Sequence, residues 1–356
     1  MNFELNDDQR MIENLVERFT SDRYPPGRRA AYRALPGGFS PENWRLLGDI
    51  GLLPLLAETP ATSGGGPVET MVVMQALGRS LVVEPVLNEI VVAGAILAAG
   101  ATPAQRARWL EPLLAGEAHL GFAFAEHEAR FSLDRLQTVV RAGRLTGRKT
   151  CAPNGADAYV VSAIEDGVAH LYLAPCDRDR MKTRTYRLVD GSFANELEFD
   201  GAEVEPLGMS LDDIRPVLDH VRLAASAEML GVIDFVFAAT LDYVKVRRQF
   251  AASIGSFQAI QHRLADLYAL KEQARSMLYR AALAAPPEVA SATAAAKAYV
   301  SRAALRITEE AIQLHGGMGI SEELDVGSGL KRVLVLSSLF GDADHETSRY
   351  NALLAA

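Results

Sequence analysis

The segment between residues 247 and 266 holds the side chains best suited to binding a nucleotide. It contains two adjacent arginines, two glutamines and two aromatic rings, namely Arg247, Arg248, Gln249, Phe250, Phe257 and Gln258. A guanidinium group pairs with phosphate, and a flat apolar ring beside positive charge suits a base. A solvated corner between two helices would show the same pair of arginines, so residue chemistry alone leaves both interpretations open.

The order of these residues resembles the Arg-x-Gln-Phe motif of acyl-CoA dehydrogenases, with its following isoleucine, Phe-Gln and Ala-Asp pairs. In that family the segment reaches across a dimer interface to the FAD of the neighbouring subunit. The resemblance therefore implies FAD as a cofactor. It assigns five residues to binding it, which are Arg247, Gln249, Phe250, Phe257 and Gln258.

A second motif follows later in the chain. Gln313, Gly316 and Gly317 resemble the family's Gln-x-x-Gly-Gly-x-Gly sequence, which also contacts the neighbour's FAD. Glycine suits such a place because a Cβ atom would hold the cofactor at a distance. Taken alone, the glycines could simply end a helix. Together and in the family's order, the two motifs predict a surface that serves the FAD of a neighbouring chain.

Asp219 and Arg222 stand three residues apart in a helical pattern and therefore share a helix face. The family has aspartate and arginine at these places, near the thioester end of the substrate. The resemblance thus makes both residues candidates for binding substrate. An ordinary ion pair on a helix is the other interpretation.

The residues that would hold this chain's own flavin are largely missing. The family carries Thr-Glu-Pro and then Ala-Gly-Ser-Asp, of which only Glu126 remains here. A second motif, Lys-x-Trp-Ile-Thr-Asn, keeps Lys149 and Asn154. Its tryptophan and threonine are replaced by Cys151 and Pro153, and proline lacks the backbone N–H donor.

The general base of the reaction is also missing from its usual places. Removing an α-proton beside a thioester, while a hydride leaves the β-carbon, requires a positioned carboxylate. Most of the family place a glutamate where Gly341 stands, and others use the position of Val221. Asp342 lies one residue away and is the remaining candidate base. The acidic residues that follow it are typical of a helix start.

The pattern of kept and lost motifs predicts a subunit that completes a partner's active site. It resembles the non-catalytic subunits of heterotetrameric bacterial acyl-CoA dehydrogenases of steroid degradation. The resemblance implies an acyl-CoA thioester substrate, a related dehydrogenase chain as partner and an electron-transferring flavoprotein as electron acceptor. The alternatives are a self-sufficient homo-oligomer with Asp342 or Glu346 as base, an FAD-free scaffold on the same fold, and a flavin oxidase or monooxygenase.

The elements that must position these motifs follow from periodicity. Helical patterns predict helices over residues 6–20, 41–50, 68–79, 87–98, 104–114, 222–245, 260–283, 291–315 and 344–354. Short runs rich in Val, Tyr, Leu and Phe predict strands over 137–141, 159–163, 170–174 and 196–199. We therefore predict an α+β fold on the acyl-CoA dehydrogenase plan. It has an N-terminal helical domain (1–116), a middle β-barrel-like domain (117–208) and a C-terminal four-helix bundle (209–356).

Composition excludes several classes of protein. The 356 residues carry a net charge of −9, which argues against a general nucleic-acid binder and against an anionic membrane surface. The apolar run over residues 90–99 is too short to span a bilayer. Seven scattered histidines and two cysteines show no metal-type spacing, so we expect no metal. A reducing cytoplasm is the expected location.

Overall fold

The computed structural model describes residues 4–57, 65–129, 131–132, 135–321 and 324–355. The chain forms two compact units that are interleaved along the sequence. The bundle unit comprises Met1–Arg29, Pro67–Val82 and Arg222–Ala356, and the sheet unit comprises Ala30–Gly66 and Val83–Val221. The long helix α9 (Arg215–Val246) begins in the sheet unit and continues into the bundle unit.

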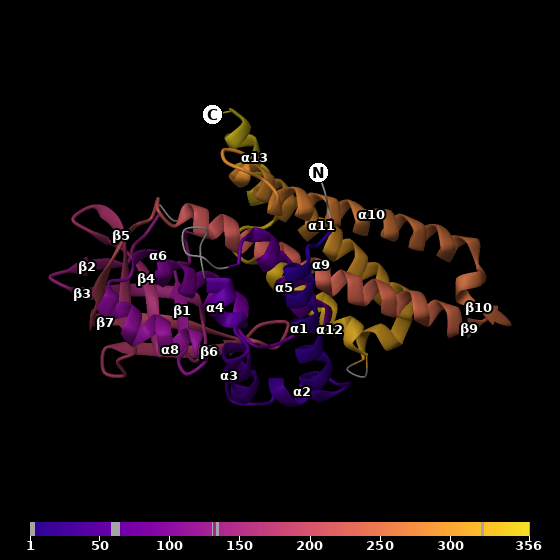
Figure 1. Ribbon diagram of the computed structural model, residues 1–356, viewed down its shortest axis with the longest axis horizontal. Coiled ribbons are helices and arrows are strands. Elements are labelled where there is room, and N and C mark those ends of the chain that lie inside the picture. Colours follow the sequence, from indigo (N-terminus) through magenta and orange to yellow (C-terminus); the bar gives the residue numbers. More distant parts are fainter. Residues whose placement is uncertain (1–3, 58–64, 130, 133–134, 322–323, 356) are drawn as a thin grey trace. The chain divides into compact units, whose positions relative to one another are not determined.

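The bundle unit is built from long helices (Figure 1). Helix α11 packs against α10, α12 and α13, while α1 packs against α5. A two-stranded hairpin follows α9, and short 3-10 segments precede α10 and follow α11. The elements after α9 are β9 (Arg248–Gln249), β10 (Ala252–Ser253), η3 (Ile254–Ser256), α10 (Gln258–Ala282), α11 (Val289–His315), η4 (Gly316–Ile320), α12 (Asp325–Ser338) and α13 (Ala343–Ala355), and the earlier ones are α1 (Asp7–Arg23) and α5 (Pro67–Arg79).

Close backbone contact fixes α9 against α5. A Cβ atom at Gly231 would overlap the carbonyl oxygen of Gln75, and one at Gly78 would overlap that of Glu228. Only glycine at these two positions lets the helices approach so closely. Among the described residues, α9 alone is long and apolar enough to cross a membrane, but 78% of its most apolar window is buried in the structure. It is therefore placed like the core helix of a bundle.

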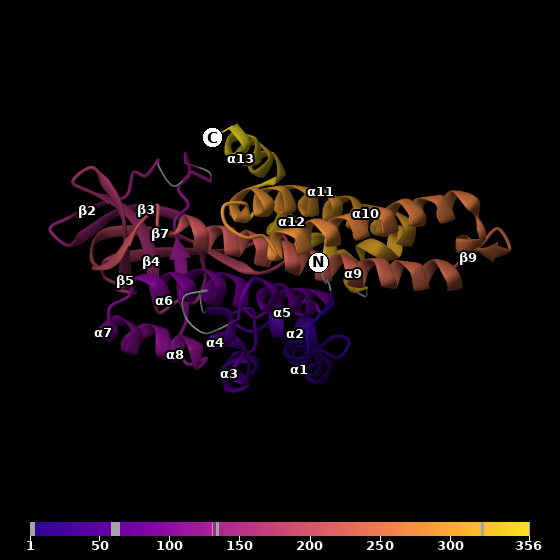
Figure 2. The ribbon, with the colours of Figure 1, turned by 45° about the horizontal axis from the view of Figure 1, so that its top comes forward.

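The sheet unit holds an eight-stranded, mainly antiparallel sheet (Figure 2). The strand order is β6-β7-β3-β2-β4-β5-β8, and β1 pairs with β4 in parallel. Its strands are β1 (Leu120–Ala123), β2 (Val139–Arg141), β3 (Arg144–Pro153), β4 (Ala158–Glu165), β5 (Val168–Pro175), β6 (Met181–Arg187), β7 (Phe193–Glu203) and β8 (Glu205–Ser210).

Short helices of the same unit lie against this sheet. The π-helix η1 contacts β1, and α6 contacts β8. Burial of Tyr159, Phe199 and Leu145 between strands supplies much of the sheet's own core. The helical segments are α2 (Arg28–Arg33, which begins in the bundle unit), α3 (Pro41–Asp49), α4 (Leu52–Ala57), η1 (Leu87–Gly94), α6 (Ala95–Gly100), α7 (Pro103–Gln105), η2 (Arg106–Leu110) and α8 (Glu111–Leu114).

The predicted α+β organisation is confirmed, although the sequence patterns missed several elements. Helix α12 and strands β3 and β6 lie in segments that we left unassigned. The helix predicted from residue 260 is α10, which begins two residues earlier, at Gln258. Contacts between residues divide the chain into two interleaved units. The division into three domains stays a prediction.

Candidate cofactor site and the loop at the base position

The two FAD-type motifs meet at one end of the bundle unit, where α9 and α11 both finish (Figure 1). The ring of Tyr243 in α9 stacks on that of His315 in α11, with centroids 4.3 Å apart. Tyr243 also packs against a buried cluster of Val244, Leu264 and Leu314. The packing of these helix ends therefore brings together segments that are far apart in the sequence.

The eight residues predicted to bind FAD are all exposed at this end. Phe250 is 88% exposed, and its ring meets that of Phe257 edge-on with centroids 6.3 Å apart. The full set is Arg247, Gln249, Phe250, Phe257, Gln258, Gln313, Gly316 and Gly317. Their roles stay predictions. The structure places them on one accessible surface of guanidinium, amide and aromatic groups.

The hairpin that carries Phe250 is strained. Gln249 pairs with Ala252, so Phe250 and Ala251 alone form its turn, and their φ angles are 53° and 64°. Two-residue turns of this kind favour Asn and Gly because a Cβ atom disfavours positive φ. Each such residue costs roughly 1–2 kcal/mol. The chain thus bears a cost to present an aromatic ring to solvent, which is a pattern typical of binding sites.

The glycine turn after α11 leaves room for an external group. Gly316 ends the helix with a φ of 60°. Cβ atoms added at Gly316 or Gly317 would meet nothing within 4 Å, whereas one at Gly319 would lie 2.9 Å from the carbonyl oxygen of Ile312. Gly319 is therefore required by packing within the chain. Gly316 and Gly317 instead offer open backbone, which fits contact with a cofactor held by another chain.

Gly341 stands at the family's base position, in the loop before α13. Ion pairs between residues of the bundle unit lie against this loop. Nε of Arg222 lies 2.8 Å from Oε1 of Glu346, and the Glu346 side chain is fully buried. That Nε–H is directed at the carbonyl oxygen of Phe340 at 3.0 Å, so the contact with Glu346 is an ion pair rather than a hydrogen bond. Arg349 approaches the second oxygen of Glu346 at 3.2 Å. Glu346 thus lies in the first turn of α13, as expected of an acidic helix start, but its side chain is buried in an ion pair.

Gly341 lies directly against this ion pair. Its φ is 127°, and a Cβ atom there would overlap Oε1 of Glu346. On the other side of the loop, Nζ of the buried Lys297 donates to the carbonyl oxygens of Leu336 and Ser337 at 2.8 and 3.1 Å. Burial lowers the pKa of Lys297 to about 7. A side chain at position 341 has no space in this arrangement.

Asp342 immediately precedes helix α13. Its Oδ1 accepts a hydrogen bond from the backbone N–H of His345 at 2.8 Å, which is the contact of a capping residue. Whether it can also act as a base stays a prediction. Asp219 is buried in the sheet unit's part of α9, and Arg222 begins the bundle unit's part. The structure thus assigns Arg222 to the pair with Glu346.

Comparison with known proteins decides the family. A model of the acyl-CoA dehydrogenase C-terminal domain matches residues 211–349, and one of the N-terminal domain matches residues 6–117. The chain belongs to the acyl-CoA dehydrogenase family.

Individual family members align over nearly the whole length of this acyl-CoA dehydrogenase family chain. Acyl-CoA dehydrogenase IpdE2 of Mycolicibacterium smegmatis is 29% identical over 345 residues, covering 96% of each chain. Acyl-CoA dehydrogenase FadE27 of Mycobacterium tuberculosis is 28% identical and covers 91% of this chain and 90% of its own. These identities support the predicted family throughout, including the middle segment that the two family models leave unmatched.

Solved structures share the same fold. A chain of the ChsE4-ChsE5 complex from Mycobacterium tuberculosis superposes with a TM-score of 0.90 at 26% identity, covering 100% of this chain and 99% of that one. A chain of the Tcur3481-Tcur3483 steroid acyl-CoA dehydrogenase variant gives 0.87 at 25% identity, covering 98% of both. The predicted dehydrogenase fold is therefore confirmed.

Two residues remain from the family motifs that would hold this chain's own flavin. They pair with each other. Nζ of Lys149 lies 2.7 Å from Oε1 of Glu126, with the lysine side chain fully buried. Thr138 donates to the same oxygen at 2.7 Å, and Gln137 N–H donates to the other at 2.6 Å. Burial alone would raise the pKa of Glu126, but Lys149 and these donors lower it. Both residues thus have an internal structural role.

In strand β3, Cys151 stands where the family motif has its tryptophan. Cys151 sits in an irregularity of β3 with a φ of 54°. Its backbone N–H donates to the hydroxyl of Tyr186 at 3.2 Å, and the same hydroxyl lies 3.3 Å from its thiol sulfur. The backbone N–H and the thiol of Cys151 are therefore both engaged by a hydroxyl of this chain. The residues present here do not fit a flavin held by the chain's own sheet unit.

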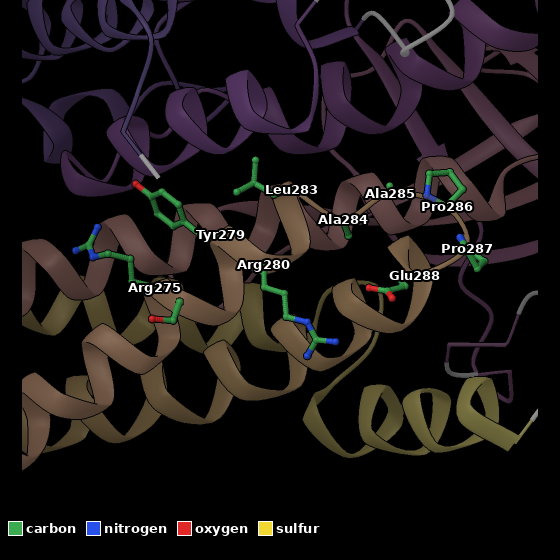
Figure 3. Close-up of a pocket in the computed structure, with 10 residues that line it drawn as sticks. Arg275, Tyr279, Arg280, Leu283, Ala284, Ala285, Pro286, Pro287 and Glu288 are labelled. Atoms are coloured by element: carbon green, nitrogen blue, oxygen red, sulfur yellow. The ribbon is translucent and has the colours of Figure 1, made fainter. Parts of the chain in front are cut away.

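A cavity of about 860 Å³ lies elsewhere in the bundle unit, along the last turns of α10 and the turn into α11 (Figure 3). Arg275, Tyr279, Arg280 and Leu283 line its helical side. None of the residues predicted to bind FAD lines it. Sequence reasoning gave no signal for this cavity, and it also missed the Tyr243–His315 stack and the burial of Glu346.

Proposed function

We propose that this chain is the non-catalytic subunit of a heteromeric acyl-CoA dehydrogenase. It completes the FAD site of a partner chain that carries the base glutamate and its own flavin contacts. One observation carries the proposal. The surface predicted to serve a neighbour's FAD is exposed, while the loop at the base position is filled by the buried pair of Arg222 and Glu346.

The chemistry of this chain's residues suits a supporting role. FAD, when bound, supplies the acceptor for the hydride that leaves the substrate's β-carbon. The guanidinium of Arg247 is suited to pairing with phosphate, and Phe250 offers a ring for stacking. The open backbone at Gly316 and Gly317 permits close approach of the cofactor. These groups bind and orient, and they exclude water from one side of the site.

The relatives support a proposed substrate class and a proposed partner. The similar structures include the ChsE4-ChsE5 complex and a two-protein steroid acyl-CoA dehydrogenase. We therefore propose an acyl-CoA thioester of steroid degradation as substrate, a heterotetramer as the assembly and an electron-transferring flavoprotein as the electron acceptor. The partner chain removes the α-proton, because Glu346 is held between two arginines and Asp342 caps a helix.

The test is to purify the chain alone and together with a related dehydrogenase chain that has the base glutamate. We expect a colourless, inactive protein alone, and a yellow complex that oxidises acyl-CoA with fewer FAD molecules than chains. A yellow and active protein from this chain alone would overturn the proposal. A complex that forms but stays colourless and inactive would favour the FAD-free scaffold, which the internal Lys149–Glu126 pair makes the second candidate.

Substitution of Phe250 sharpens the test. The ring is 88% exposed, so Phe250→Ala should leave the fold and the assembly unchanged while FAD is retained at least about tenfold less tightly, the equivalent of one stacking contact. Met11→Ala is the matched control, because Met11 is 64% exposed but lies on α1, away from both motifs. Equal FAD retention by the two variants would contradict the assignment of Phe250.

A further inference from the structure

Tyr243 and His315 form a direct contact between the two segments that carry the FAD-type motifs. Their rings are nearly parallel, with an angle of 22° between the planes and 4.3 Å between the centroids. The hydroxyl of Tyr243 also lies 3.4 Å from the carbonyl oxygen of His315. The two residues therefore touch both through their rings and through the Tyr243 hydroxyl and the His315 carbonyl.

The histidine ring is held in one orientation. Its Nδ1 lies 2.8 Å from the carbonyl oxygen of Ala311, one turn earlier in α11. A carbonyl oxygen can only accept a hydrogen bond, so Nδ1 carries the proton and donates. His315 is only 5% exposed, and the buried Leu314 and Leu264 lie in the adjoining cluster. The ring therefore has little freedom to turn or move.

Each partner is joined directly to a motif. The carbonyl oxygen of Tyr243 accepts the backbone N–H of Arg247 at 2.8 Å, and the carbonyl of Arg247 accepts Ile254 N–H at 2.8 Å, which closes the hairpin. His315 is the last residue of α11 and immediately precedes Gly316. A change in the distance between the two rings would thus move the hairpin relative to the glycine turn.

We infer that Tyr243 and His315 are a positioning pair that sets the separation between the Phe250 hairpin and the Gly316–Gly317 turn. Neither ring needs to touch FAD for this role. The inference rests on the proposed function, because the separation matters to a cofactor that both segments contact. Small displacements of positioning groups are known to weaken binding strongly.

A first experiment uses the isolated chain and needs no cofactor. Tyr243→Leu removes the ring stack, whereas Tyr243→Phe keeps the ring and removes only the hydroxyl. We expect the amides of residues 316–320 to exchange with deuterium at least ten times faster in Tyr243→Leu than in the wild type, and within threefold of it in Tyr243→Phe. Unchanged exchange at residues 316–320 in Tyr243→Leu would overturn the inference.

A second experiment uses the complex with the catalytic partner. We expect Tyr243→Leu to weaken FAD retention at least tenfold and to shift the flavin absorbance bands, with assembly unchanged. Leu278→Ala is the control for a loss of core packing, because Leu278 is fully buried in α10 but belongs to neither motif. An equal loss of FAD in Leu278→Ala, or none in Tyr243→Leu, would overturn the inference. A wild-type complex without FAD would instead overturn the proposed function.

Discussion

Arg222 and Glu346 form an ion pair at the place where a catalytic dehydrogenase keeps its base. The charged atoms are 2.8 Å apart, and the side chains are 9% and 0% exposed. Arg349 lies against the other oxygen of Glu346. The two arginines therefore engage both oxygens of this buried carboxylate within the chain. Oε1 of Glu346 thus fills the space that a side chain at position 341 would need.

Glu346→Gln should destabilise the chain by about 3 kcal/mol or more, because it leaves two arginines beside a neutral amide in a buried site. Urea unfolding measures the change. The control is Asp344→Asn, since Asp344 is 94% exposed and pairs with Arg302 on the surface. That change should cost less than about 1 kcal/mol. Similar losses of unfolding free energy in the two variants would show that the buried pair contributes no more to stability than the surface pair.

Gly341→Glu should fail to convert the chain into an active dehydrogenase. The new Cβ atom would overlap Oε1 of Glu346, and the backbone at this position has a φ of 127°, which side chains rarely adopt. We expect a loss of at least about 2 kcal/mol in unfolding free energy and no acyl-CoA oxidation by the isolated chain. Activity appearing in Gly341→Glu would mean that Glu346 and its arginines can move aside.

The fold could be predicted where periodicity was strong, as in α9 and α11. Helix α12 was missed because Gly327, Gly329 and three serines weaken its helical pattern. The structure explains Gly329, since a Cβ atom there would crowd Val236 of α9. Strand β6 was missed because it is an exposed edge strand rich in Lys and Arg, and alternation of apolar residues is absent. In both cases, tertiary packing and position in the fold overrode the local pattern.

The candidate site was predictable only in part. Arg247 and Gln313 were found because their spacing matches motifs that lie within short segments. The pairing of Glu346 with Arg222 joins residues far apart in the sequence, and no local pattern reports such a contact. For the same reason, Lys149 and Glu126 looked like remnants of a flavin site, while the structure shows them paired with each other.

Gly317→Ala should separate binding from folding. A Cβ atom at Gly317 meets nothing within 4 Å in the chain, so unfolding free energy should change by less than about 1 kcal/mol. In the complex, however, the methyl group would stand where we place the partner's FAD, and retention should fall at least tenfold. Equilibrium dialysis of FAD against the reconstituted complex measures this. Unchanged retention would remove Gly317 from the site.

The buried pair of Glu89 and His119 should make the stability of the sheet unit depend on pH. Oε2 of Glu89 lies 2.9 Å from Nδ1 of His119, and the Glu89 side chain is 1% exposed. Burial raises the pKa of Glu89 to about 7, although His119 and the N–H of Leu120 oppose the shift and Asp157 adds to it. Burial alone would lower the pKa of His119, but the hydrogen bond and charge of Glu89 raise it.

Both groups therefore hold protons more tightly in the folded chain than in the unfolded one. Between about pH 4.5 and 7 the folded state binds more protons, so this contribution to stability is present at low pH and is lost as pH rises through about 7. Urea unfolding at pH 5.5 and pH 8 should show a fall of about 1–2 kcal/mol in wild type. Glu89→Gln should lose most of that fall, while Glu203→Gln, at a carboxylate that is 80% exposed, should keep it. Identical pH dependence in the wild type and Glu89→Gln would rule out this pair as the source.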